Sequence, residues 1–113
     1  MLPNQFHANS MSELLNLDQM REISGLEFMQ GILDGRYPSP PIGKTLGYYL
    51  TEVEEGRVVF SGAPSFDAFN PMGTVHGGWY GTLLDSAMAC AVMTKVPKGS
   101  IYTTLEYKVN IIK

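Results

Sequence analysis

The longest apolar tract of the chain, residues 79–93, restricts the folds that the sequence can adopt. Only Thr82, Asp85 and Ser86 interrupt it with polar side chains. It is shorter than the roughly 20 apolar residues that a helix needs to cross a bilayer. A helix with apolar side chains on almost every side is stable in water only when other elements surround it. We therefore predict a long helix at the centre of the domain and no membrane partner.

Length and charge exclude several classes of protein. A chain of 113 residues with 44% apolar and 17% charged residues is typical of one globular domain. Its eight Lys and Arg residues are scattered and its net charge is −3, so we expect no nucleic-acid partner. A single cysteine, Cys90, cannot form an intrachain disulfide, and the N-terminus lacks the basic and apolar stretches of a secretory signal. These features predict a cytoplasmic protein.

Two Ser-x-x-Glu sequences in the N-terminal third have the spacing of a capping box. They begin at Ser10 and Ser24, and apolar residues follow each of them at helical intervals. We predict short helices within residues 10–35, after a flexible tail at residues 1–9, with Gly35 ending the second helix.

The rest of the chain has strand patterns on either side of the long helix. Residues 36–43 contain three prolines and are predicted to be a linker, since proline cannot continue a helix. Alternating apolar residues from 44 to 53 and the apolar run 58–60 indicate a β-hairpin. The strongest strand pattern covers residues 101–112, whose odd-numbered side chains share one face. We predict one domain over residues 10–113, with its core from residue 44 onward.

This order of elements predicts an α+β fold in which an antiparallel sheet wraps around one central helix. Three strands are a thin cover for an apolar helix. We therefore expect the sheet to be incomplete within this chain and its missing edge to be supplied in an oligomer.

The turn that leads into the long helix has the features of an anion-binding site. Gly77 and Gly78 let another molecule approach the backbone closely, and the first amides of a helix carry partial positive charge. Such a site stabilises a developing oxyanion.

Asp85 lies about two helical turns further on, within the apolar tract, where a carboxylate is costly to bury without a role. A carboxylate in this setting can act as a general base or as a nucleophile. Strand alternation directs Thr103 toward the helix as a hydrogen-bond partner for Asp85. The alternative is a structural carboxylate that Thr82, Ser86 or a backbone amide satisfies.

Four features together resemble the PaaI-like acyl-CoA thioesterases of the hotdog superfamily: Asn70, the His76-Gly77-Gly78 turn, Asp85 and Thr103. The resemblance runs from the second N-terminal helix to the end of the chain and implies the hotdog fold. It implies hydrolysis of an aryl-acyl or medium-chain acyl-CoA at the interface of a homodimer or homotetramer. No cofactor is implied, because coenzyme A is part of the substrate. Such relatives continue for about two strands beyond the position of Lys113.

The resemblance also implies roles for individual residues. The Gly77 amide would polarise the thioester carbonyl, and Asn70 would position the thioester or the water. Asp85 would attack the carbonyl or activate water, and Thr103 falls where relatives carry a hydroxyl that assists the carboxylate. Further substrate-binding positions would be His76, Gly78, Phe69, Met72, Trp79 and Thr82.

Simpler interpretations stand beside these roles. His76 and Asn70 are residue types common at turns, and the aromatic and Met side chains can be plain core. Two histidines without a cysteine cluster predict no metal site. The alternative functions are a non-catalytic acyl-CoA-binding module and an inactive truncated thioesterase. A dehydratase is disfavoured, because such relatives place a catalytic histidine in a different local pattern.

Overall fold

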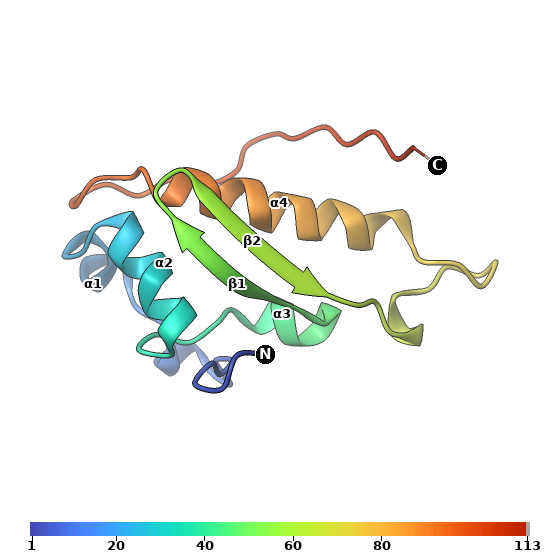
Figure 1. The fold of residues 1–113 in the computed structure, drawn as a ribbon, viewed down its shortest axis with the longest axis horizontal. Helices are drawn as coiled ribbons and strands as arrows, with labels where there is room; N and C mark the ends of the chain where they lie inside the picture. Colours follow the sequence, from blue (N-terminus) through green and yellow to red (C-terminus); the bar gives the residue numbers. More distant parts are fainter. Residues whose placement is uncertain (113) are drawn as a thin grey trace.

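The computed structural model describes residues 1–112, which form the predicted mixture of helices and an antiparallel sheet (Figure 1). The first strand contacts an N-terminal helix, and the second contacts the long helix. In chain order the elements are the 3-10 helix η1 (Met11–Glu13), α1 (Leu17–Arg21), α2 (Gly25–Asp34), α3 (Pro41–Leu46), β1 (Tyr48–Glu54), β2 (Arg57–Gly62), the 3-10 helix η2 (Phe66–Ala68) and α4 (Gly77–Met93).

Helix α2 begins and ends where the sequence predicts. The Ser24 hydroxyl accepts a 3.1 Å hydrogen bond from the Glu27 amide. Gly35 ends the helix with a φ of 87°, a left-handed conformation that favours glycine.

The capping box predicted at Ser10 is wrong. The Ser10 side chain makes no capping hydrogen bond. In a capping box the Glu13 carboxylate would accept from the Ser10 amide, but here it accepts from the amide of Asn9, one residue earlier. The reciprocal cap forms at α1 instead, between Asn16 and Gln19. Amide side chains satisfy free helical amides as serine and glutamate do, so this cap has the same chemistry with different residues.

The N-terminal tail packs against the domain, although its sequence predicts flexibility. The Ala8 amide donates to the Ser39 carbonyl at 3.0 Å, and the Ser39 amide donates to the Phe6 carbonyl at 2.7 Å. The Gln5 side chain donates to the Leu50 carbonyl at 2.9 Å. Backbone pairing of this kind holds residues 5–8 against the segment that follows α2.

The predicted linker over residues 36–43 is partly helical. Helix α3 begins at Pro41, a position where the missing amide hydrogen is not needed, and it ends at Gly47 with a φ of 76°. It takes up the first residues of the strand predicted from residue 44, so β1 begins only at Tyr48.

The predicted β-hairpin is confirmed. Tyr48 pairs with Gly62 across β1 and β2, and a bulge interrupts the register in the middle of β1. At the turn of the hairpin, the Gly56 amide donates a 2.7 Å hydrogen bond to Thr94 Oγ1 at the end of α4. This bond holds the tip of the hairpin against the long helix.

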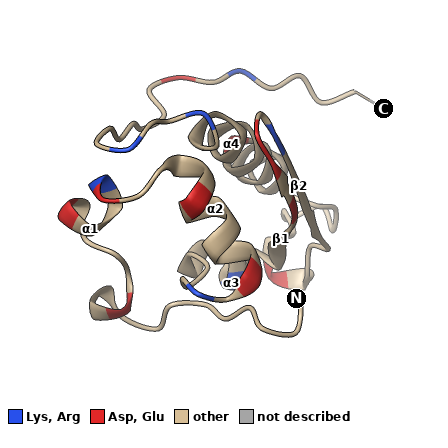
Figure 2. Cartoon of the chain, turned by 60° about the vertical axis from the view of Figure 1, so that its left-hand side comes forward, with Lys and Arg blue, Asp and Glu red and all other residues tan. Residues whose placement is uncertain are grey.

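Helix α4 forms as predicted, but other elements cover only part of it. Met93 packs with Met29 and Ile32 of α2 and with Leu50 of β1 in the buried core. The prediction of a helix surrounded on all sides is wrong for the described residues, because the sheet beside it has two strands. Figure 2 shows that α4 is largely free of charge. One row of its apolar side chains remains 39–53% exposed: Tyr80, Leu84, Met88 and Val92.

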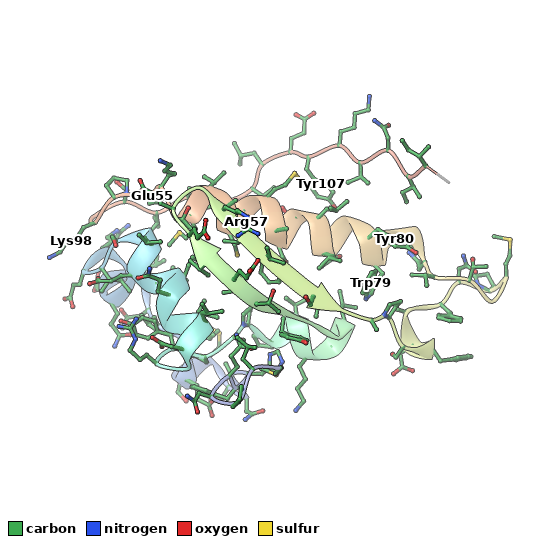
Figure 3. The ribbon with its side chains drawn as sticks, in the orientation of Figure 1. Glu55, Arg57, Trp79, Tyr80, Lys98 and Tyr107 are labelled. Atoms are coloured by element: carbon green, nitrogen blue, oxygen red, sulfur yellow. The ribbon has the colours of Figure 1, made fainter. Side chains whose placement is uncertain are left out.

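Residues 101–112 run back along α4 without forming the predicted strand (Figure 1). A strand needs a neighbouring backbone to exchange hydrogen bonds, and the sheet of the described residues contains only β1 and β2. Contacts with α4 are made by side chains. Tyr107 points toward α4 in Figure 3, and a Cβ at Gly81 would lie 3.2 Å from its hydroxyl. A complete hotdog sheet is therefore absent from residues 1–112.

Candidate active site

A closed loop brings the chain to the start of α4. The Asn70 amide donates to the Thr74 carbonyl at 2.8 Å, and the His76 amide donates to the Ala68 carbonyl at 2.8 Å. Gly73 takes a φ of 81° at the tip, where glycine is favoured. These bonds fix the direction from which the chain enters the helix.

The Asn70 side chain is engaged within this loop. Its Oδ1 accepts hydrogen bonds from the amides of Met72 and Thr74, at 3.0 and 3.2 Å, and its Nδ2 donates to Thr74 Oγ1 at 2.8 Å. Both lone pairs of the oxygen are used, which leaves one Nδ2 hydrogen for another partner. In the structure, Asn70 therefore stabilises the loop through its side chain.

His76 caps α4 with its imidazole. Nδ1 accepts a 2.8 Å hydrogen bond from the Gly78 amide, which assigns the hydrogen of the neutral ring to Nε2. The Gly77 amide donates no hydrogen bond to any described residue. Of the two glycine amides, only that of Gly77 is therefore available to an oxyanion.

Asp85 lies on the side of α4 that faces the C-terminal segment. It is half-buried rather than buried, and its Oδ1 accepts a 2.9 Å hydrogen bond from Thr104 Oγ1. Neither neighbouring hydroxyl satisfies it. Thr82 Oγ1 donates to the Gly78 carbonyl, and Ser86 Oγ bonds to the Tyr48 hydroxyl.

The structure therefore pairs Asp85 with Thr104, the residue after the predicted Thr103. Alternation fixes which face a side chain takes only where a strand is held in register by its neighbours. Residues 101–112 have no paired neighbour among the described residues, so the alternation assumed from the sequence does not apply.

The two central groups of the site are far apart within one chain. Gly77 and Asp85 are eight residues apart on one helix, which corresponds to about 12 Å along its axis. A thioester carbonyl must lie roughly 3 Å from both the oxyanion donor and the attacking group. A single copy of the chain does not bring Gly77 and Asp85 to one carbonyl.

The predicted substrate-binding residues divide between core and surface. Trp79 is buried, and its Nε1 donates a 2.7 Å hydrogen bond to the Leu46 carbonyl, which anchors α4 to α3 (Figure 3). Phe69 packs against Phe66 with tilted rings and a ring-centroid distance of 5.6 Å, and Met72 is 82% exposed in the loop. The structure brings none of these three side chains to Asp85.

A partly open cavity lined by neighbours of Asp85 is the feature that the sequence does not predict. Its volume is about 330 Å³, and its walls come from the N-terminal segment, α2, the segment that follows α2, the hairpin, α4 and the C-terminal segment. Ser86 and Thr104 line it, the first adjacent to Asp85 in the chain and the second hydrogen-bonded to it. Because six segments from different parts of the chain build this cavity, no local sequence pattern indicates it.

Burial changes the acidity of groups in the cavity wall. Burial, with a smaller contribution from the negative charge of Asp85, raises the pKa of the Cys90 thiol to about 11. Burial also raises the pKa of the Tyr102 hydroxyl to about 12, and the negative charges of Cys90 and Asp85 add to this effect. Both groups are therefore neutral near pH 7, and Cys90 is an unreactive thiol there.

Comparison with known proteins finds one family. Residues 72–111 match the model of the thioesterase superfamily. The matched segment contains Gly77, Asp85 and Thr104, and it leaves Asn70 outside. Comparison with curated proteins and with solved structures gives no match.

Two further findings concern membranes and metals. No helix of residues 1–112 has the length and apolar character required to cross a membrane. The same residues contain no cluster of three His, Cys, Asp or Glu side chains that could bind a metal ion.

Proposed function

We propose that this chain is a thioester hydrolase that acts on acyl-CoA. The observation that carries the proposal is the Asp85–Thr104 pair on a helix whose first amide, that of Gly77, has no partner among the described residues. A carboxylate can activate the attacking water, and a free amide can stabilise the oxyanion that forms during hydrolysis of a thioester. The match of residues 72–111 to the thioesterase superfamily supports this chemistry.

In the proposed reaction, Asp85 activates water or attacks the thioester carbonyl directly. Thr104 holds Oδ1 and leaves Oδ2 free to face the reacting atoms. When water attacks, Asp85 takes its proton, the new C–O bond forms, and the carbonyl oxygen becomes an oxyanion bound by the Gly77 amide. The C–S bond then breaks and the CoA thiolate takes up the proton, which yields a carboxylic acid and a thiol.

The 12 Å separation along α4 makes two copies necessary for this reaction. We infer that the Gly77 amide of one copy and Asp85 of a second copy flank the same thioester. A symmetric dimer with antiparallel α4 helices would create two such sites. The exposed apolar row of α4 gives such a partner a surface to cover.

The proposed substrates are aryl-acyl and medium-chain acyl thioesters of coenzyme A, with no cofactor. Within the superfamily, the His76-Gly77-Gly78 turn and Asp85 support the PaaI-like group. We also propose a cytoplasmic location, which the single cysteine of the chain supports.

Thiol release from a panel of acyl-CoAs tests the proposal. Asp85→Asn is expected to lower kcat/KM by at least about 100-fold, the usual effect of removing a general base. Asp18→Asn is the matched control, because Asp18 is an exposed carboxylate of α1 whose ion pair with Arg21 has an N–O distance of 3.9 Å. Equal thiol release by wild type and Asp85→Asn would disprove the hydrolase.

A second candidate is an acyl-CoA-binding module without turnover. For a chain that functions as a monomer, the distance between Gly77 and Asp85 favours the binding module over hydrolysis. Equilibrium binding of acyl-CoA with no thiol release over hours, by a protein of monomeric mass, would support this function over hydrolysis.

A further inference from the structure

The cavity beside Asp85 has the dimensions of a binding site for an organic group. A cavity of about 150 Å³ with apolar walls is large enough to bind benzene. The cavity here, at about 330 Å³, is roughly twice that size. It can therefore hold an aromatic ring with several further carbons, or a medium-length alkyl chain.

The walls are apolar over most of their area. Side chains of α2, the hairpin and α4 provide this surface, among them Met29, Ile32, Leu50, Phe60 and Met93. Apolar walls of this kind favour hydrocarbon over water.

One end of the cavity adjoins the candidate catalytic group. Thr104 lines the cavity and donates to Asp85, and Ser86 is the next residue of α4. The opposite wall comes from the segment that follows α2, which lies across α4 from the C-terminal segment (Figure 1). A thioester held at Asp85 can thus extend its acyl group into the cavity.

A pair of hydroxyls interrupts the apolar wall. The Tyr48 hydroxyl and Ser86 Oγ are 2.9 Å apart, and both residues line the cavity. Each hydroxyl has one hydrogen, and one of the two is used in the bond between them. The pair therefore keeps one hydrogen without an acceptor, in a setting where an unused donor is unfavourable.

A third hydroxyl of the wall, that of Ser39, makes no hydrogen bond to the described residues. Ser39 also lines the cavity and is 4% exposed. Buried hydroxyls without partners are rare in folded proteins. Two unsatisfied donors in a cavity whose walls are mostly apolar point to a ligand that carries an oxygen.

We propose that the cavity binds the acyl group of the thioester, and that the Tyr48–Ser86 pair donates a hydrogen bond to an oxygen substituent on it. The preferred substrates would then be hydroxy- or oxo-acyl thioesters rather than unsubstituted ones. This inference rests on the proposed function for the identity of the ligand. The cavity and its hydroxyls are independent of whether hydrolysis occurs.

Binding of free acids tests the cavity separately from hydrolysis. The full chain is titrated with octanoic acid and with a panel of monohydroxyoctanoic acids, and affinities are measured calorimetrically. We expect at least one hydroxy acid to bind about 5- to 10-fold more tightly than octanoic acid, as a single additional hydrogen bond provides. Tyr48→Phe and Ser86→Ala should each remove this preference and leave the affinity for octanoic acid within about two-fold.

Two controls complete the design. Tyr80→Phe removes a hydroxyl from the exposed row of α4, outside the cavity, and should leave the preference unchanged. Ala89→Leu fills part of the cavity and should weaken binding of all the acids. Far-UV circular dichroism checks that each variant is folded.

The outcomes separate the two proposals. Absence of binding, equal affinity for all acids, or a preference that survives both hydroxyl variants would overturn the cavity assignment. Unchanged binding to folded Ala89→Leu would also overturn it. Selective binding without any thiol release from acyl-CoA would support the cavity assignment and disprove the hydrolase.

Discussion

Thr104 Oγ1 donates a 2.9 Å hydrogen bond to Asp85 Oδ1, and this bond joins the C-terminal segment to α4 at the candidate catalytic carboxylate. The threonine hydroxyl fixes one carboxylate oxygen and so determines where the other one points. A hydroxyl that takes no part in bond making or breaking can therefore affect the rate by positioning the base.

Removing this hydroxyl should slow hydrolysis without abolishing it. Thr104→Val keeps the shape of the side chain and is expected to lower kcat/KM by about 5- to 30-fold, the equivalent of about 1 to 2 kcal/mol for a partly exposed bond to a charged group. Thr104→Ser restores the hydroxyl and should recover most of the activity. Steady-state thiol release measures both variants, and equal rates for Val and Ser would show that the bond has no catalytic role.

The Gly77 amide can be removed without removing the helix. Proline is well tolerated at the first helical position, and His76 before it is already extended, with φ of −62° and ψ of 134°, as a residue before proline must be. Gly77→Pro should lower kcat by about 100- to 1000-fold, the effect of losing one oxyanion donor. Gly77→Ala is the matched control, because it keeps the amide and adds a Cβ at 3.3 Å from Ile111 Cδ1. If the two variants have equal activity, the amide is not the oxyanion donor.

The sequence predicts the elements whose signals are local. The start of the long helix near His76, the Ser24 cap, the Gly35 terminus and the hairpin each depend on a few neighbouring residues, and each is present in the structure. The resemblance to hotdog thioesterases runs from the second N-terminal helix to the end of the chain, and it includes residues 72–111, which match the superfamily model. Local capping and turn chemistry is therefore sufficient to find the helix that carries the candidate site.

Predictions that depend on distant partners are less successful. Thr103 was the expected partner of Asp85 from strand alternation, yet residues 101–112 have no paired neighbour to fix their faces, and Thr104 makes the bond. Burial of Asp85 and of all sides of α4 assumed a wider sheet than β1 and β2 provide. The hydroxyl pair joins residues 38 positions apart, and the cavity joins His7 to Thr104, which no local pattern reveals.

The raised pKa of Cys90 makes the stability of the fold sensitive to alkaline pH. The thiol ionises at about 11 in the folded chain, against an ordinary value of 9.0. Between these values the unfolded chain has lost the proton and the folded chain retains it, so the free energy of unfolding falls as pH rises. The stabilisation is complete below pH 9 and is lost through about pH 11, and its total is on the order of 2 kcal/mol.

Urea unfolding at pH 7, 9 and 10 measures this dependence. Wild type is compared with Cys90→Ala. The smaller alanine side chain lowers stability at every pH, so the quantity compared is the change in the free energy of unfolding with pH. We expect wild type to lose stability between pH 9 and 10 and Cys90→Ala to lose less. Burial also raises the pKa of Tyr102 and of Tyr48, so these tyrosines too lower the free energy of unfolding as pH rises. Their effect on stability falls mainly above pH 10. Parallel curves for the two proteins would show that Cys90 is not the responsible group.

Mixing two inactive variants distinguishes a site shared between copies from a site within one chain. Gly77→Pro lacks the oxyanion donor and Asp85→Asn lacks the base, so each alone should be nearly inactive. If each site takes Gly77 from one copy and Asp85 from the other, a mixed dimer contains one site with both groups intact. Unfolding the two variants together and refolding an equal mixture should then restore about a quarter of the wild-type rate, since half of the dimers are mixed and each has one working site. A site built within one chain would show no recovery, because every chain in the mixture lacks one of the two groups.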